Sequence, residues 1–111
     1  MAIYCIKIKY TKEAIIGMME DGEDRANAMR SLTEELGGKL ISFYGMVGQD
    51  FHVMGIVEMP EYANLSAGIV TGLMAGTIDD YKVIPLYKSS DVTKISTLHK
   101  KALTQYKKPG N

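Results

Sequence analysis

The spacing of the apolar residues switches along the chain between a strand period of two and a helix period of about 3.6. The order of these segments restricts the fold more than any other feature of the sequence. In residues 3–10, isoleucines and tyrosines alternate with lysines, which predicts a half-buried strand. Residues 12–36 then place apolar side chains at nearly helical spacing until Gly37-Gly38 ends the pattern. Four acidic residues surround Gly22 within this stretch, so we expect the helical region to break or kink there.

Two strand-like segments follow, over residues 39–47 and 51–59. Between them lies Gly48-Gln49-Asp50, in which the glycine permits positive φ and the aspartate can close a turn, so a hairpin is predicted. Pro60 ends the second segment because proline has no N–H for the ladder. The remaining segments are a helix over residues 62–76, a strand over 77–88 and an amphipathic helix that begins near Ser90 and Asp91.

The order strand, helix, strand, strand, helix, strand predicts the βαββαβ arrangement of ferredoxin-like folds. This is an α+β class in which two helices cover one face of a four-stranded antiparallel sheet. At 111 residues the chain has room for one such domain, which we expect to occupy residues 1–88. We expect residues 89–111 to form an added C-terminal helix and a tail that frays.

The second and third predicted strands are apolar on both of their faces. On the second strand, Leu40, Tyr44 and Met46 alternate with Ile41, Phe43 and Val47; on the third, Phe51, Val53 and Val57 alternate with Met54 and Ile56. The face away from the two helices therefore needs a cover, and the C-terminal helix could dock there, on its own subunit or across a dimer. A sheet that is apolar on both faces also implies a partner sheet, so we expect a homodimer or a higher homo-oligomer.

Charge and cysteine content exclude several classes of partner. Thirteen Lys and Arg residues balance thirteen Asp and Glu residues, so we expect no nucleic-acid partner. No apolar run approaches the roughly 18 residues needed to cross a bilayer, so we expect no membrane association. The single cysteine, Cys5, cannot form an intramolecular disulfide, which suits the reducing cytoplasm. The two histidines, His52 and His99, have no spacing typical of metal ligands, and we expect no metal or other cofactor.

Several segments of the sequence resemble the GYD-domain family, a small family of the dimeric α+β barrel superfamily. The matching segments, which together span about residues 1–88, are Ile3-Tyr4 through Tyr10-Thr11, Glu35 through Leu40, Phe43-Tyr44, and Gly48-Gln49-Asp50 leading into Val57 through Pro60. The Gly-Tyr-Asp triplet that names the family is present here as Gly48-Gln49-Asp50. The resemblance implies the barrel fold, usually as a homodimer, and it implies no particular reaction. Relatives in the superfamily include cofactor-free monooxygenases, isomerases, cyclases and haem enzymes.

His52 is the candidate catalytic residue. Alternation on the third strand places His52 on one face with Met54 and Ile56, whereas Val53 and Val57 lie on the face that suits the helix-packed core. The imidazole would then point into the space between the two sheets of a dimer, where it could transfer protons near neutral pH. The alternative is a structural histidine that is hydrogen-bonded to a tyrosine or a backbone carbonyl at the subunit interface.

Four further side chains are candidates for ligand binding: Tyr44, Met54, Tyr81 and Tyr87. A phenol can donate its proton to a carbonyl or stack on an aromatic ligand, and methionine lines adaptable apolar pockets. The alternative for each of them is packing, with the tyrosine hydroxyls in water.

Three glycines, Gly68, Gly72 and Gly76, repeat every four residues along one side of the second long helical segment. Together they cost the helix about 3 kcal/mol in propensity relative to alanine. We therefore expect close approach to a strand, a partner or a bound ligand at these positions.

Three functional hypotheses remain open from the sequence. The first is a homodimer that binds a small apolar or aromatic molecule in the cleft between sheet and helices. The second is a cofactor-independent monooxygenase or isomerase in which His52 shuttles a proton while Tyr44 or Tyr87 positions a carbonyl or phenolate. The third is a structural or regulatory assembly module. A closed, apolar cavity containing His52 would favour the first two, and a filled interface would favour the third.

Overall fold

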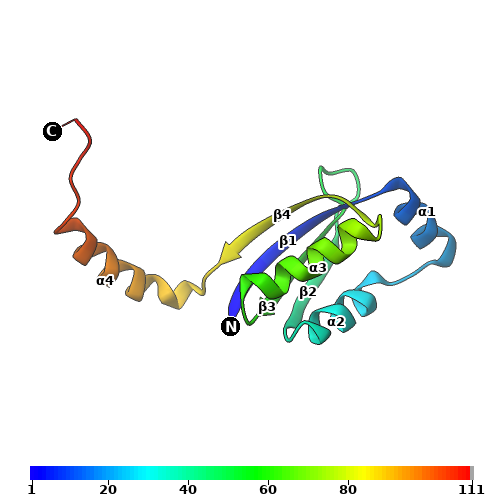
Figure 1. The fold of residues 1–111 in the computed structure, drawn as a ribbon, viewed down its shortest axis with the longest axis horizontal. Coiled ribbons are helices and arrows are strands. Elements are labelled where there is room, and N and C mark those ends of the chain that lie inside the picture. The colour runs from blue at the N-terminus through cyan, green and yellow to red at the C-terminus, as the bar shows by residue number, and fades with distance from the viewer. Residues whose placement is uncertain (111) are drawn as a thin grey trace.

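The structure, a computed structural model, describes residues 1–110. Its elements follow the predicted order along the chain, with the first helical region divided in two (Figure 1). The strands are β1 (Ala2–Tyr10), β2 (Lys39–Gly45), β3 (Val53–Met59) and β4 (Ile78–Leu86), and the helices are α1 (Lys12–Asp21), α2 (Arg25–Glu35), α3 (Tyr62–Met74) and α4 (Val92–Leu103). A short 3-10 turn over Ser89–Asp91 precedes α4. Within residues 1–110, no helix is both long enough and apolar enough to cross a membrane.

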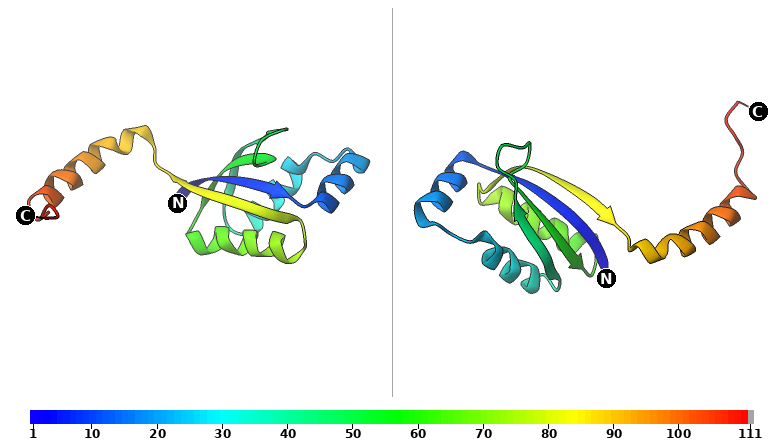
Figure 2. Two further views of the ribbon diagram at one scale, coloured as in Figure 1. Left: turned by 90° about the horizontal axis from the view of Figure 1, so that it is seen from above. Right: turned by 180° about the vertical axis from the view of Figure 1, so that it is seen from behind.

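The four strands form one antiparallel sheet in the order β2-β3-β1-β4. Helices α2 and α3 pack on one face of this sheet, and no other element of residues 1–110 covers the opposite, outer face (Figures 1 and 2). This arrangement is the predicted α+β, ferredoxin-like fold. The C-terminal Asn111, part of the tail that we expected to fray, lies outside the described residues.

The predicted break in the first helical region is confirmed at Gly22. Gly22 has a φ of 62°, a left-handed conformation that favours glycine, and its backbone N–H bonds to the carbonyl of Met18. Helix α2 then begins after Asp24, whose carboxylate accepts a hydrogen bond from the backbone N–H of Ala26. The break turns the chain back toward the sheet, and it thereby places Arg25, the first residue of α2, next to the core.

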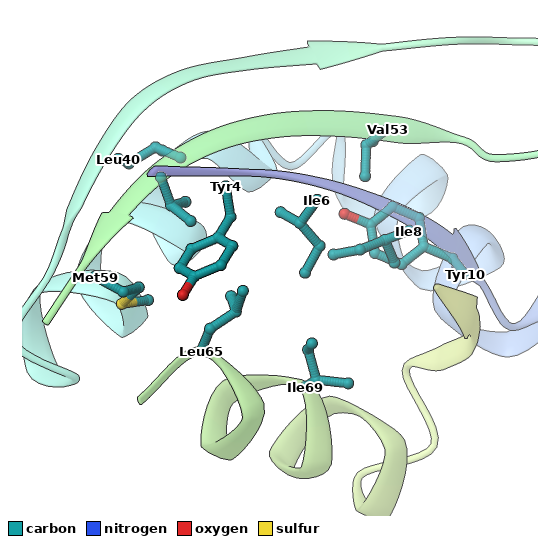
Figure 3. Close-up of a cluster of buried hydrophobic side chains, with 10 residues drawn as sticks. Tyr4, Ile6, Ile8, Tyr10, Leu40, Val53, Met59, Leu65 and Ile69 are labelled. Carbon is teal, nitrogen blue, oxygen red and sulfur yellow. The ribbon is translucent and has the colours of Figure 1, made fainter. Parts of the chain in front are cut away.

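The hydrophobic core fills the space between the sheet and helices α2 and α3. The alternation predicted for the first strand is confirmed, because every second residue of β1 from Tyr4 to Tyr10 is buried against the helices. The buried members of the core are Tyr4, Ile6, Ile8, Tyr10, Leu40, Val53, Val57, Met59, Leu65 and Ile69, most of which are drawn in Figure 3.

A β-bulge in the second strand changes the faces that strict alternation predicts. The register between β2 and β3 skips Ile41, which has no residue opposite it. Leu40 and Phe43 therefore both pack toward the core, while Tyr44 is on the outer face and 62% exposed. The predicted grouping of Leu40 with Tyr44 is wrong because one extra residue reverses the alternation that follows it.

The predicted hairpin is confirmed, with shorter strands than expected. The connection between β2 and β3 spans residues 46–52, and Gly48 within it has a φ of 81°. The loop closes where the backbone N–H of Met46 donates to the carbonyl of His52 at 2.7 Å. His52 therefore precedes the first residue of β3 instead of lying within the strand.

Helix α4 points away from the sheet of its own chain (Figures 1 and 2). The molecule extends over 60 × 32 × 23 Å, and its radius of gyration is 17.9 Å, compared with about 13 Å for a compact chain of this length. The apolar stripe predicted for this helix is exposed, with Val92 at 56% and Ile95 at 42%. Its members are Val92, Ile95, His99, Ala102 and Tyr106. Docking of α4 on its own subunit, one of the two expected arrangements, is therefore wrong, because the chain leaves the sheet edge after β4 without folding back.

Candidate functional site

A cavity of about 180 Å³ lies between the sheet and helices α2 and α3. Its apolar walls include Ile6 and Ile8 from β1, Met29 and Leu36 from α2, and Leu65 and Ile69 from α3. Figure 3 shows Leu65 and Ile69 reaching from α3 toward the side chains of β1. Protein interiors are normally packed without voids of this size, so the cavity is the candidate ligand site of the molecule.

Two glycines of α3 line the same cavity and allow the helix to pack closely against its neighbours. A Cβ added at Gly68 would stand 3.0 Å from Cδ1 of Leu36, and a Cβ at Gly72 would overlap the side chain of Ile78. The predicted close approach is therefore confirmed at Gly68 and Gly72. It is wrong for Gly76, which has open space beside it and a φ of 74° at the end of the helix.

Tyr10 and Arg25 place two polar atoms in the cavity wall that have no hydrogen-bond partner. Tyr10 is only 5% exposed, and both its hydroxyl and the Nε of Arg25 are buried and unpaired. The hydroxyls of Thr33 and Thr71, which also line the cavity, donate to carbonyl oxygens of their own helices at 2.6 and 2.8 Å. A buried donor without an acceptor costs about 1–3 kcal/mol, so the two unpaired groups call for a functional reason.

Burial raises the pKa of the Tyr10 hydroxyl above its usual value of 10.0. The nearby guanidinium of Arg25 acts in the opposite direction on this pKa, while the negative charge of Glu23 raises it further. A phenol with a pKa at or above its usual value is protonated at neutral pH, so the hydroxyl can donate a hydrogen bond. Its ring runs from the end of β1 back toward the middle of the core, with the hydroxyl at the inner end (Figure 3).

The guanidinium of Arg25 is held on its outer side by Glu23. Nη1 donates to Oε1 of Glu23 at 3.1 Å, and the two side chains are 28% and 39% exposed. Nη1 is engaged near the surface, whereas Nε is buried and has no hydrogen-bond partner. Arg25 is also the only charged residue among those that line this cavity.

His52 supports Tyr10 and does not itself line the cavity. Its Nδ1 accepts a hydrogen bond from the backbone N–H of Tyr10 at 3.0 Å, and the two rings are stacked with centroids 6.2 Å apart. An accepting Nδ1 carries no proton, which assigns the ring proton of the neutral imidazole to Nε2. Alternation predicted that His52 would face outward with Met54, and this is wrong because His52 precedes β3 and its ring lies against a core tyrosine. The structure joins the histidine to a tyrosine of the same chain through the tyrosine's backbone N–H, whereas the structural alternative expected such a bond at the subunit interface.

The four predicted ligand-binding residues lie outside the cavity. Tyr44 and Met54 are paired across β2 and β3 on the outer face. Tyr81 is on the edge strand β4, opposite Ile8, and is 41% exposed, whereas Tyr87 follows β4 and is 65% exposed. The structure therefore brings Tyr44 and Met54 together and separates both from the cavity.

The sequence reasoning missed Tyr10 and Arg25 as site residues. Tyr10 fitted the strand pattern as an ordinary packing residue, and its free hydroxyl depends on contacts that only the folded chain makes. The position of Arg25 in the sequence provided one indication of a role in the site. A cation in the first turn of a helix opposes the positive end of the helix dipole, which indicates that something other than helix stability places it there.

Among residues 1–110, no three His, Cys, Asp or Glu side chains come together in a way that could hold a metal ion. The chemistry that the cavity offers is therefore that of two hydrogen-bond donors, one of them a guanidinium, at the edge of an apolar space.

The GYD domain family model matches residues 4–96 of this chain. No curated protein matches the chain significantly. Among solved structures, the chain is similar to the crystal structure of an uncharacterized NIPSNAP domain protein from Burkholderia xenovorans. The TM-score is 0.51 and the sequence identity 8%, over 80% of this chain and 95% of that chain. This likeness supports the fold alone. Because the family match covers most of the chain, as the sequence resemblance implied, the chain belongs to the GYD domain family.

Proposed function

We propose that this protein binds a small, mostly apolar molecule in the cavity between the sheet and helices α2 and α3. The observation that carries the proposal is the cavity of about 180 Å³, walled by aliphatic side chains and edged by two unpaired donors. An apolar cavity of roughly 150 Å³ is large enough for benzene, so this one has room for a single substituted ring or a short aliphatic chain.

The packing of α3 supports a binding role for this space. Gly68 and Gly72 each cost the helix about 1 kcal/mol relative to alanine, and they bring α3 against Leu36 and Ile78. Even with this close approach, the centre of the core stays unfilled. An unfilled apolar space forfeits dispersion contacts that a bound molecule would restore.

A thermal-shift titration with toluene tests the proposal. Toluene should raise the melting temperature of the wild-type protein, because a ligand that binds only the folded state stabilises it by mass action. Ile69→Phe adds volume at the cavity wall and should abolish this shift. The matched control is Val70→Phe on the same helix, since Val70 is 54% exposed, does not line the cavity and should leave the shift intact.

Two outcomes would contradict the proposed function. One is the absence of any shift of the wild-type melting temperature with toluene, phenol or nitrobenzene. The other is an equal shift in the wild-type protein and in folded Ile69→Phe, which would place binding elsewhere on the molecule.

We also infer that two copies of the chain associate through the outer face of the sheet. Strand pairing puts Ile3 opposite Leu86, and Cys5 opposite Ile56 and Ile84, on this face. An uncovered apolar sheet face of this kind is typical of a protein–protein interface. The exposed stripe of α4 could add to the same interface by docking on the partner.

A cytoplasmic location is part of the same proposal. It is supported by the lone cysteine, since Cys5 is a free, buried thiol in β1 and a reducing compartment keeps such thiols intact.

A further inference from the structure

The end of the cavity nearest to Tyr10 and Arg25 differs from its aliphatic walls. The hydroxyl of Tyr10 and the Nε of Arg25 are both donors, both are buried, and neither has an acceptor. We propose that the molecule bound in this cavity carries a carboxylate at one end, and that Tyr10 and Arg25 hold this carboxylate while the aliphatic walls hold the apolar remainder. This inference rests on the proposed function, which it narrows to small apolar carboxylates.

A carboxylate suits these two donors for two reasons. It accepts as many hydrogen bonds as the pair can donate, and its negative charge is opposite to that of Arg25. A carboxylate has two oxygens and accepts hydrogen bonds only, so it can satisfy both donors at once. Hydrogen bonds in which donor or acceptor is ionised are roughly twice as strong as neutral ones, and the Arg25 Nε–H belongs to a permanently charged group.

The surroundings of the pair favour an anion over a cation. None of the residues that line the cavity is acidic, and Arg25 is the only charged one among them. The carboxylate of Glu23 is bound to Nη1 of Arg25, and its side chain is 39% exposed. A negative charge inside the cavity would therefore meet the guanidinium directly and no acidic side chain of the wall.

The position of Tyr10 is set by two contacts that leave its hydroxyl free. His52 accepts the Tyr10 backbone N–H through Nδ1 and stacks on its ring. In addition, the register between β1 and β4 shifts between Lys9 and Tyr10, an irregularity that re-aims the side chain at the end of the strand. His52 is therefore a positioning residue for Tyr10 in this arrangement.

Calorimetric titration with benzoate, nitrobenzene and toluene tests the inference. Benzoate and nitrobenzene have nearly the same shape, but only benzoate is an anion, so their comparison isolates the charge. We expect wild-type protein to bind benzoate about tenfold more tightly than nitrobenzene, the factor that corresponds to one charge-assisted hydrogen bond.

Arg25→Leu should lower benzoate affinity about tenfold or more and leave toluene binding in place. The matched control is Arg30→Leu, because Arg30 is the second arginine of α2, is exposed and bonds only to Asn27 on the surface. Tyr10→Phe keeps the ring and removes the hydroxyl, so it should weaken benzoate binding several-fold without changing toluene binding.

The result that would overturn the inference is nitrobenzene binding as tightly as benzoate in the wild-type protein. Unchanged benzoate affinity in folded Arg25→Leu would overturn it as well. Neither result affects toluene binding, so neither contradicts the proposed function. Failure of all three ligands to bind wild-type protein would instead overturn the proposed function. The wild-type comparison needs no variant, so it decides the question even if Arg25→Leu does not fold.

Discussion

At the scale of single residues, His52 and Tyr10 form a unit whose roles differ from those that residue type alone would assign. The histidine is the more reactive group by its chemistry, yet its Nδ1 is engaged with the backbone N–H of Tyr10. The tyrosine, in contrast, lines the cavity and has a buried hydroxyl without a hydrogen-bond partner. In the proposed binding mode, the atom that donates to the ligand therefore belongs to a residue that fits the strand pattern as ordinary core packing.

Replacing His52 by alanine should lower the free energy of unfolding by about 1–3 kcal/mol, because the N–H of Tyr10 would lose its acceptor. Urea denaturation measures this change, and faster hydrogen exchange of the Tyr10 amide would locate it. The control is Lys100→Ala on α4, an exposed position outside the apolar stripe, where we expect a change within about 0.5 kcal/mol.

Equal stability of His52→Ala and wild-type protein, with unchanged exchange at Tyr10, would show that this hydrogen bond contributes nothing to the free energy of unfolding.

The same variant tests the hypothesis that the protein is an enzyme, once a turnover assay exists. Loss of a general acid or base typically lowers a rate by about 10²-fold or more, whereas a purely positioning residue shows its effect in ligand affinity as well.

At the scale of elements, the bulge in β2 sets which side chains of that strand face the core, and the glycines of α3 set how closely this helix packs beside the cavity. The bulge at Ile41 turns Phe43 toward the core, where its Cδ1 would lie 3.2 Å from a Cβ at Gly55. The glycines at positions 68 and 72 then set how closely α3 approaches α2 and β4. Local patterning predicted each element, but the approach distances depend on side chains that are distant in sequence.

Gly72→Ala should lower the free energy of unfolding by about 1–3 kcal/mol, because its Cβ would overlap the side chain of Ile78 and force the helix outward. Gly17→Ala is the matched control in the helix α1, since a Cβ there meets nothing within 4 Å. The control should raise the free energy of unfolding by about 0.5–1 kcal/mol through helix propensity alone. Urea denaturation of both variants measures the difference, and a stabilising Gly72→Ala would show that α3 can move without loss.

At the scale of the whole molecule, the elongated shape leaves two apolar surfaces without a cover in the single chain. One is the outer face of the sheet, and the other is the stripe of α4, on which Val92 is 56% exposed and Ile95 is 42% exposed. Docking of α4 on a partner's surface would cover both at once, whereas the isolated chain has no way to bury them without folding α4 back.

Light scattering should give about twice the chain mass of 12.3 kDa at micromolar concentration. Ile84→Lys places a charge on the outer face and should shift the protein to the monomer, because burying an unpaired charge in an interface is unfavourable. Val47→Lys is the control, since Val47 is 98% exposed in the β2–β3 loop and should leave the mass unchanged. A wild-type mass equal to that of one chain would contradict the proposed dimer.

Periodicity alone predicted the order of the elements, the break at Gly22 and the inward face of β1, because these features depend on local backbone geometry and on which side chains avoid water. The sequence pattern also carried the family resemblance.

The sequence pattern did not predict the residues of the candidate site. Tyr10 ends β1 and Arg25 begins α2, and the two meet at the cavity only because the chain turns back at Gly22 and the helices pack on the sheet. Whether a buried polar atom has a partner is a property of three-dimensional contacts, so the unpaired donors, the cavity that Tyr10 and Arg25 line and the direction of α4 emerged only from the tertiary structure.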